Sequence, residues 1–341
     1  MFIERVKMKK LFVLFSFILL SFLIVPGAPS YADEAKLREN FQIEIADLFW
    51  KRKFSELEAR SSLYRKSQSR TPSGFWELDL MYYGLRNVIS SSSVSDGEWE
   101  KVFKILDEWI DMHPDSPSAH ITKAAFLEKF AWKIRGHSFA KDVPKEAWGT
   151  FFGALKIAED YLNENKDIAS QDPEWYARML SILGGSGSNS MAYERVLKEG
   201  LDKYPNYYGI YNVAVLYLLP QWRGDKHQIE DFANEAVERS QQTDGMAMYA
   251  RIYWGLSQTQ YKAKLFRETD ASWPKMRQGF RDILKKYPDP RNQNSFAFFS
   301  CAAKDKETLK ELLDKIDTPL IYVWYTQDYY DFCKNFAAST D

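Results

Sequence analysis

The sequence predicts an all-α fold, and three observations support this fold class. Apolar residues recur three and four positions apart through most of the chain after its N-terminal segment, which is the spacing of one helix face. Helix start signals, a cap residue followed by Pro or by Glu three positions later, precede several of these stretches. Sustained alternation with a period of two residues, which would indicate strands, is scarce. A chain of helices joined by short turns is therefore expected.

Residues 1–32 have the three parts of a secretory signal peptide. Four basic residues and one glutamate lie in the first ten positions, and the apolar run Leu11–Val25 follows. Pro26 and Gly27 end this run, and Ser30-Tyr31-Ala32 places small residues at the cleavage position, so cleavage is expected after Ala32. An uncleaved membrane anchor is the alternative, although this run of 15 residues is shorter than the roughly 20 that cross a bilayer as a helix.

Removal of the signal changes the charge of the chain. The first 32 residues contribute +3 to a net charge of −1, so residues 33–341 carry about −4. A mildly acidic chain without a long basic run does not indicate binding to nucleic acid or to an anionic membrane. No other apolar stretch is long enough to span a bilayer, and no Cys near the cleavage position indicates a lipid anchor. We therefore expect a periplasmic or secreted protein with no stable membrane insertion after cleavage.

Three stretches show the helical pattern most clearly. Their apolar positions are, in chain order, Val102, Ile105, Leu106, Trp109 and Ile110; Tyr193, Val196, Leu197 and Leu201; and Phe280, Ile283, Leu284 and Tyr287. The intervening positions of the second stretch are charged, as expected for a helix with one face in solvent.

Start signals place the beginnings of four helices. Ser95 with Glu98 forms a capping box. Ser116-Pro117 and Asp172-Pro173 each put a cap residue before a Pro at the first helical position. Asp305 is positioned to cap a helix that runs through three leucines.

Three helices share one kind of ending, in which a ring residue, Pro and then Asp or Asn follow each other. These endings are His113-Pro114-Asp115, Tyr204-Pro205-Asn206 and Tyr287-Pro288-Asp289. The ending resembles that of the second helix of a tetratricopeptide (TPR) repeat, because Pro stops the helix and the next residue favours a turn. The three prolines lie 91 and 83 positions apart, whereas the TPR period is about 34 residues. A TPR-like helical-hairpin array, or α-solenoid, with irregular repeats is therefore expected over residues 33–341.

Longer strings resemble an uncharacterised bacterial family, domain of unknown function 4034. The strings are Ala131–Gly136, Leu218–Gly224 (LLPQWRG), Gly245–Tyr253 (GMAMYARIY) and Phe296–Asp305. The resemblance covers about residues 45–325 and departs at Lys304, where the family usually has Gly. It implies an α-helical, TPR-like fold and no established reaction.

Seven residues combine aromatic rings with guanidinium groups near helix ends. They are Trp132 and Arg135, Trp222 and Arg223, and Tyr249, Arg251 and Tyr253. One interpretation is that the rings belong to the core and the arginines cover them. The other is a shared groove for a peptide or another carboxylate-bearing ligand.

The predicted function is a protein- or peptide-binding scaffold, because helical arrays form long binding surfaces without catalytic groups. An extracytoplasmic enzyme, acting for example on the cell wall, and an accessory protein to a secreted effector are the alternatives. No catalytic residue, cofactor or metal site is predicted, since the four histidines lack metal-ligand spacing. The glycine-rich stretch Leu183–Asn189 lacks the Lys of a phosphate loop, and a flexible connection with a hinge near residues 184–190 is expected instead.

The C-terminal region contains both cysteines and many rings. Cys301 and Cys333 could form a disulfide in an oxidising compartment or remain buried thiols. The rings of Tyr322–Phe336 either form a terminal cap over the array, within residues 320–341, or an exposed partner surface. Leu320–Trp324 is compatible with a short strand and with an extended linker.

Overall fold

The computed structural model describes residues 34–89, 95–136, 138, 140–187, 190–222 and 224–339. The predicted signal peptide, residues 1–32, lies outside this part of the chain, as does Arg223. The described residues are helical and contain no strand, although an isolated antiparallel bridge joins Arg70 and Trp76. The all-α prediction is therefore confirmed.

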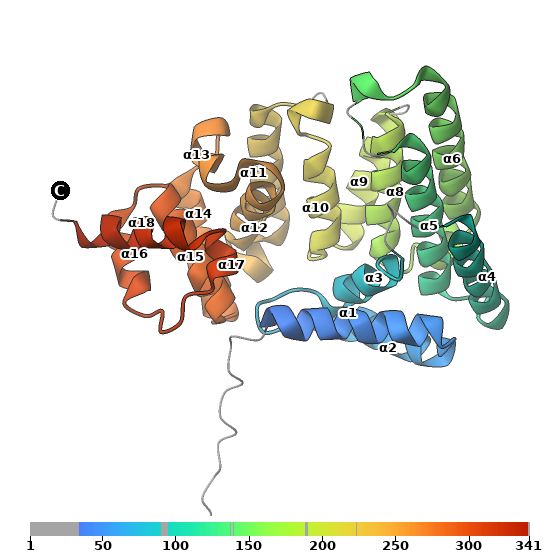
Figure 1. The fold of residues 1–341 in the computed structure, drawn as a ribbon, viewed down its shortest axis with the longest axis horizontal. Coiled ribbons are helices and arrows are strands. Elements are labelled where there is room, and N and C mark those ends of the chain that lie inside the picture. The colour runs from blue at the N-terminus through green and yellow to red at the C-terminus, as the bar shows by residue number, and fades with distance from the viewer. Residues whose placement is uncertain are drawn as a thin grey trace, which may run out of the picture.

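Ten α-helices occur in the described residues from 34 to 216, and they pack mainly on helices close to them in sequence. They are α1 (Glu34–Trp50), α2 (Phe54–Ser67), α3 (Glu77–Arg86), α4 (Asp96–Met112), α5 (Pro117–Arg135), α6 (Lys145–Glu164), α7 (Lys166–Ala169), α8 (Glu174–Ser186), α9 (Ser190–Lys203) and α10 (Tyr208–Leu216). Helix α4 packs on α5, α5 on α6, and α8 on α9. Figure 1 shows α5, α6, α8, α9 and α10 side by side, with α1 to α3 lying across their lower ends.

The second half continues with shorter and less regular helices. They are α11 (Lys226–Asp244), α12 (Ala247–Leu256), α13 (Leu265–Glu268), α14 (Trp273–Lys286), α15 (Pro290–Ala302), α16 (Lys306–Leu313), α17 (Ile321–Trp324) and α18 (Gln327–Ala338). A π-helical turn, Ser257–Tyr261, extends α12, and a 3-10 turn, Pro220–Trp222, follows α10. One continuous hydrophobic core runs from Ile45 in α1 to Ala337 in α18.

Most of the predicted helix starts and ends are confirmed. Ser95 and Glu98 form the capping box of α4, and Ser116 caps α5 with Pro117 at its first position. Asp305 caps α16 by accepting a hydrogen bond from the Thr308 N–H. Helices α4, α9 and α14 each end before the ring residue that precedes Pro.

Helix α8 begins one residue later than predicted. Pro173 is its N-cap, yet the Asp172 carboxylate still accepts a hydrogen bond from the Glu174 N–H at 2.9 Å. The carboxylate thus stabilises the first turn of α8 from one position further away than expected.

Two local predictions differ from the structure. Leu320–Trp324 is neither a strand nor an extended linker, because Ile321–Trp324 forms the helical turn α17. The side-chain amide oxygen (Oδ1) of Asn294 accepts hydrogen bonds from the Leu320 N–H and from the Trp324 indole, which fixes the turn against α15. This long-range contact overrides the strand propensity of the segment.

The glycine-rich stretch is also less open than predicted, since α8 continues through Ser186. A Cβ at Gly184 would lie 2.6 Å from the Tyr217 ring, and a Cβ at Gly185 would lie 3.2 Å from Trp132. The two glycines therefore let rings pack against the last turn of the helix. Ser188 and Asn189 lie outside the described residues.

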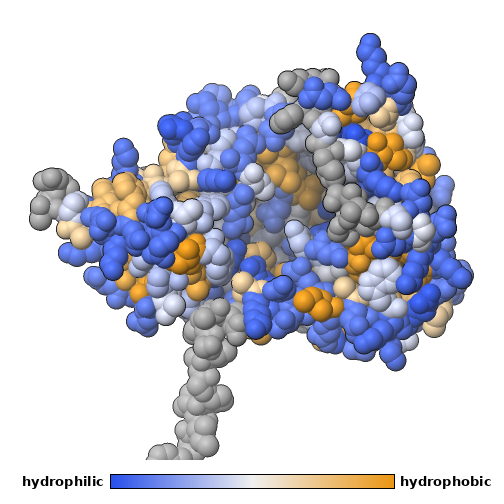
Figure 2. Space-filling model, in the orientation of Figure 1, coloured by the Kyte–Doolittle hydropathy of each residue, from blue (hydrophilic) through white to orange (hydrophobic). Residues whose placement is uncertain are grey.

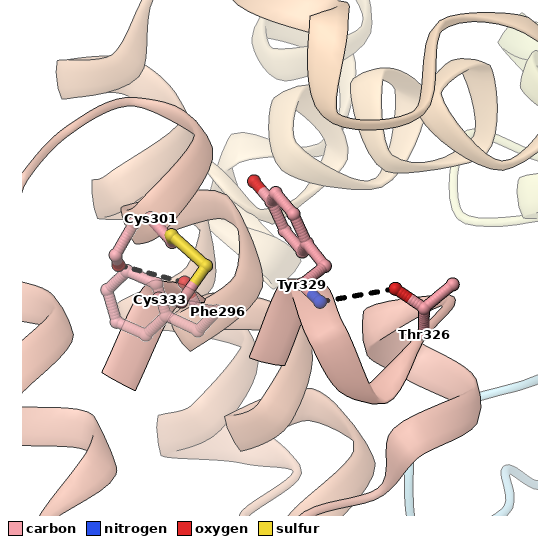
Figure 3. The surroundings of a disulfide bond; sticks show 6 residues. Phe296, Cys301, Thr326, Tyr329 and Cys333 are labelled. Atoms are coloured by element: carbon pink, nitrogen blue, oxygen red, sulfur yellow. Dashed lines mark hydrogen bonds between the residues drawn. A yellow bond between two sulfur atoms is a disulfide. The ribbon is translucent and has the colours of Figure 1, made fainter. Parts of the chain in front are cut away.

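A disulfide joins Cys301 of α15 to Cys333 of α18 (Figure 3). Around it, Trp324 is buried and Tyr329, Tyr330 and Phe336 pack on the core, while other rings of the segment are exposed. The C-terminal helices thus cover part of α15 and also present rings to solvent. No helix among the described residues has the length and apolarity that crossing a membrane requires.

Candidate functional site

A cavity of about 240 Å³ lies where four distant parts of the chain meet. Its walls come from the segment before α3 and α3 itself, from α10, from α12 with its π-helical turn, and from the start of α15. Figure 2 shows this face of the molecule hollowed near its centre, with hydrophobic residues inside, over the part of the ribbon that Figure 1 labels α10. We call this space the arginine cavity, because Arg251 and Arg291 line it among Phe75, Trp76, Tyr208 and Trp254.

The segment before α3 reaches the centre of the molecule through polar contacts. The Asn206 carbonyl oxygen accepts hydrogen bonds from Trp76 Nε1 at 2.9 Å and from Arg70 Nη2 at 3.3 Å. Asn292 Nδ2, at the start of α15, donates to the Ser73 carbonyl oxygen at 3.1 Å. These bonds hold Phe75 and Trp76 against the cavity, although they precede Asn292 by more than 200 residues.

Gly74 is needed for the segment before α3 to lie this close to Arg251 and Tyr287. Its φ of +89° is one that residues with a Cβ rarely adopt. A Cβ there would also lie 2.8 Å from Arg251 Nη2 and 2.8 Å from the Tyr287 ring. Gly74 therefore allows the Arg251 guanidinium to lie directly against the segment before α3.

The Arg251 guanidinium stacks on rings rather than pairing with a carboxylate. Its central carbon lies 4.6 Å from the centre of the Tyr208 ring and 5.7 Å from that of Tyr287. Nε and Nη2 are buried and have no hydrogen-bond acceptor in the described part of the chain. The charge of this side chain is therefore not balanced by a direct ion pair with a described residue.

Arg291 is the second cation of the cavity, and it is only 6% exposed. Its guanidinium lies 4.9 Å from the centre of the Phe75 ring and 4.7 Å from that of Trp254. Nε and Nη1 are buried and have no acceptor among the described residues. Burial, together with the positive charges of Arg38 and Arg251, lowers the pKa of Arg291 to about 10.

A smaller hollow of about 210 Å³ adjoins the arginine cavity and shares Trp254, Gln258 and Arg291 with it. Arg38 of α1 lines this second hollow and lies over the Phe75 ring at 4.2 Å. Its ion pair with Glu34 is long, at 3.9 Å. Three guanidinium groups therefore surround the two adjoining hollows.

The nearby carboxylates are engaged mainly with backbone and hydroxyl groups. Glu34 accepts hydrogen bonds from the Thr71 hydroxyl at 2.7 Å and from the Ser73 N–H at 3.0 Å. Asp289 caps α15 through the Arg291 N–H at 2.8 Å, and its other oxygen has no partner among the described residues. Burial and the charge of Glu34 raise the pKa of Asp289. These carboxylates hold the backbone in place without forming a close ion pair to Arg251 or Arg291.

Two partly buried arginines elsewhere in the described part of the chain are paired. Arg178 bonds Glu128 at 2.9 Å and Glu174 at 3.1 Å, and Arg65 bonds Asp172 at 3.0 Å. A buried charge normally has such a partner, because an unpaired one is costly to remove from water. The cavity arginines depart from this rule, which makes the cavity the candidate functional site.

The structure separates the seven residues of the expected groove into different places. Trp132 and Trp222 do meet, with ring centres 6.2 Å apart, and the Arg135 guanidinium lies 5.5 Å from the Trp132 ring. Tyr249 and Tyr253 are fully buried on α12 and donate hydrogen bonds to Glu230. These two tyrosines are therefore core residues, as the first interpretation has it.

Arg251 shares α12 with these tyrosines but lines the arginine cavity. Trp222 lines a separate hollow of about 540 Å³ together with Trp148, Phe152 and Tyr217. The seven residues therefore do not form one groove in the part of the chain that the structure describes, and Arg223 lies outside that part. Of the seven, Arg251 is the residue that reaches the arginine cavity.

Sequence reasoning missed Arg38, Gly74 and Arg291. Arg291 follows the Asp289-Pro290 start of α15, a signal that indicates the helix but not the direction of the side chain. Arg38 lies on α1 among several other charged residues. No local pattern distinguishes these arginines from solvated ones, because their neighbours come from distant parts of the chain.

The described residues contain no group of three or more His, Cys, Asp or Glu side chains that could hold a metal ion. His120 has a structural role, since its ring nitrogens lie 2.7 Å from the Tyr161 hydroxyl and 2.8 Å from the Pro114 carbonyl oxygen. No family model, curated protein or solved structure matches the chain. The chemistry of the arginine cavity is therefore the main guide to function.

Proposed function

We propose that this protein is an exported, TPR-like helical-repeat protein that binds a carboxylate-bearing ligand, such as the free end of a peptide or a smaller organic acid, in the arginine cavity. The observation that carries the proposal is the pair Arg251 and Arg291, whose buried N–H groups have no acceptor among the described residues. Guanidinium groups match the planar carboxylate and can donate two parallel hydrogen bonds to it. A bound carboxylate would also balance charge that the folded chain leaves uncompensated.

The rings of the cavity suit the remainder of such a ligand. Phe75, Trp76 and Trp254 offer apolar surface beside the two guanidinium groups. Most ligand sites combine an apolar lining with a few polar groups that fix orientation. The lining therefore suits a ligand with an apolar part beside its carboxylate.

Export rests on the sequence of residues 1–32, and two features of the mature part are in keeping with it. A disulfide between Cys301 and Cys333 favours an oxidising compartment. The described part also contains no helix that could cross a membrane. N-terminal sequencing of the protein recovered from the periplasm or medium should begin at Asp33.

Calorimetric titration of the mature protein, residues 33–341, tests the ligand class. The probes are two matched pairs, 4-methylpentanoate with 4-methylpentanamide and the tripeptide Gly-Gly-Leu with its C-terminal amide. We expect the acid of at least one pair to bind and its amide to bind at least about tenfold more weakly, a difference of 1.4 kcal/mol. Equal affinity for acid and amide, or no binding by either acid, would contradict the proposal.

Variants locate the binding in the arginine cavity. Arg251→Gln and Arg291→Gln should each weaken binding of the acid by tenfold or more. Arg267→Gln is the matched control, because Arg267 is exposed on α13 and forms its ion pair with its neighbour Glu268. If both cavity variants bind the acid as the control does, the ligand lies elsewhere and the proposal is wrong.

A further inference from the structure

A carboxylate also faces the arginine cavity. Asp79 of α3 lines it together with Arg251 and Arg291. Within the described part of the chain, Asp79 forms no ion pair and its side chain accepts no hydrogen bond. The cavity therefore presents positive and negative groups that are not paired with each other.

Arg86 and Arg178, the two arginines whose charges lower the pKa of Asp79, form ion pairs with other carboxylates. Arg86 bonds Glu174 at 2.5 Å, and Arg178 bonds Glu128 and Glu174. Glu174 also accepts a hydrogen bond from the Tyr207 hydroxyl at 2.8 Å. This network uses the cations of α3 and α8 and leaves Asp79 without one of its own.

We propose that Asp79 binds the ammonium group of a small zwitterion whose carboxylate lies against Arg251 and Arg291, and that the ligand is a free α-amino acid with an apolar side chain. This inference rests on the proposed function and narrows it. An ammonium group would give Asp79 the partner that the protein does not supply. A simple acid would leave Asp79 unpaired and would place two negative groups in one cavity.

The size and lining of the cavity favour a single amino acid. Its volume of about 240 Å³ is below the roughly 300–1,000 Å³ of pockets that enclose drug-sized molecules. Val215, Leu216 and Ile252 provide aliphatic surface for a side chain.

Calorimetric titration of the mature wild-type protein at pH 7.5 tests the inference without any variant. The probes are leucine, isoleucine, valine, methionine and phenylalanine, with 4-methylpentanoate as leucine without its amino group and 3-methylbutylamine as leucine without its carboxylate. We expect at least one amino acid of the panel to bind. If leucine binds, it should bind at least tenfold more tightly than either of its two analogues. If no amino acid of the panel binds, or if 4-methylpentanoate binds as tightly as the best of them, the inference is wrong.

Asp79→Asn separates recognition of the amino group from recognition of the carboxylate. This variant should lower the affinity for the amino acid at least tenfold and leave the affinity for 4-methylpentanoate unchanged or higher. Asp317→Asn, at an exposed position between α16 and α17, is the control. A parallel loss for both probes would show that Asp79 only maintains the structure. If 4-methylpentanoate binds through Arg251 while no amino acid binds, the proposed function stands and this inference fails.

The pH dependence gives a second readout. Burial and the charge of Glu174 raise the pKa of Asp79 to about 6, although Arg86 and Arg178 act in the opposite direction. The groups around Asp79 are thus Glu174 and Arg178 of α8, Arg86 of α3, Tyr207 before α10, and the cavity arginines. Since the ammonium requires the ionised carboxylate, affinity for the amino acid should rise between pH 5 and pH 7, and that for 4-methylpentanoate should not. Identical pH profiles for the two probes would overturn the assignment.

Discussion

Arg178 and Arg291 are both largely removed from solvent, and they differ in how their charge is balanced. Arg178 neutralises Glu128 and Glu174, which are both buried. Arg291 is more deeply buried than Arg178 but faces rings and other cations. Burying a charge without a partner opposes folding, whereas a buried ion pair offsets much of that penalty. The two positions should therefore respond in opposite ways to the same substitution.

Arg178→Met should lower the free energy of unfolding by about 3–5 kcal/mol, because it leaves two buried carboxylates without their shared cation. Arg291→Met should leave the free energy of unfolding unchanged or raise it by about 1 kcal/mol, since Met keeps aliphatic contact with Phe75 and Trp254. Urea denaturation of both variants measures the difference. A loss of more than 2 kcal/mol at Arg291 would indicate that its role is structural.

Asp79→Asn should stabilise the ligand-free protein at neutral pH. Burial raises the pKa of Asp79 from 3.8 to about 6, so the folded state keeps its proton to a higher pH than the unfolded state does. The wild type therefore loses stability as the pH rises from about 4 to 6, whereas the Asn variant has no proton to lose. We expect no difference between them near pH 3.5 and a gain of about 1–3 kcal/mol above pH 6. Thermal unfolding at both pH values measures it, and a variant less stable at pH 7 would contradict it.

The residues of the candidate site were only partly predictable. Arg251 was among the expected groove residues, and the structure places it in the arginine cavity. Tyr249 and Tyr253 neighbour it in sequence but point into the core, because positions two apart on a helix face different sides. Arg291 joins the site through contacts with Phe75, more than 200 residues earlier. Local periodicity shows which face of a helix is apolar, and it does not show which distant segment will cover that face.

Close helix contacts in this fold depend on particular glycines. A Cβ at Gly279 of α14 would lie 2.5 Å from the Met246 carbonyl oxygen at the start of α12. Gly279→Ala must push the two helices apart and should lower the free energy of unfolding by about 1–3 kcal/mol. Gly153 of α6 is exposed, and a Cβ there would have no atom within 4 Å. Gly153→Ala should therefore raise the free energy of unfolding by about 0.5–1 kcal/mol. Urea denaturation measures the free energy of unfolding of both variants. If the two substitutions change it by the same amount, α12 and α14 do not pack this closely.

The disulfide between Cys301 of α15 and Cys333 of α18 should stabilise the protein by restricting the conformations of the unfolded chain. It closes a loop of 32 positions, for which the chain-entropy relation gives about 3–4 kcal/mol. The double variant Cys301→Ser with Cys333→Ser should lose about this much in denaturant unfolding. Reductant should lower the wild type to the same level and leave the variant unaffected. An unaltered wild type in reductant, with two titratable thiols, would mean that the cysteines are not paired in solution.

At the level of single helices, local chemistry was a good guide where the signal is local. Ser95 and Glu98 cap α4 through contacts three residues apart. The segment Leu320–Trp324 misled the prediction because its conformation depends on Asn294, which lies on another helix. Gly184 and Gly185 lie inside α8 rather than after it for a similar reason, since Tyr217 and Trp132 pack against its last turn. Caps are set by neighbours in sequence, and these exceptions are set by neighbours in space.

The arrangement of the whole molecule departs from a purely linear array. In a linear array each repeat touches only its neighbours. Here the segment before α3 bonds Asn206 before α10 and Asn292 of α15. These contacts bring the beginning, middle and end of the described chain to one cavity. The N-terminal helices therefore link units that the order of the chain keeps apart.

Hydrogen exchange under native conditions tests this linkage. Because α3, α10 and α15 meet at the arginine cavity, we expect their slowest amides to exchange through one shared opening, with free energies within about 1 kcal/mol of each other. A linear array would instead fray from its ends, so that α3 would open at a free energy several kcal/mol below that of α10. As denaturant is added, the opening free energies of the three helices should fall along one common line against denaturant concentration, since one opening exposes the same surface for all three. If the opening free energies of α3 and α15 fall along different lines against denaturant concentration, the polar contacts at Asn206 and Asn292 do not couple the ends of the molecule.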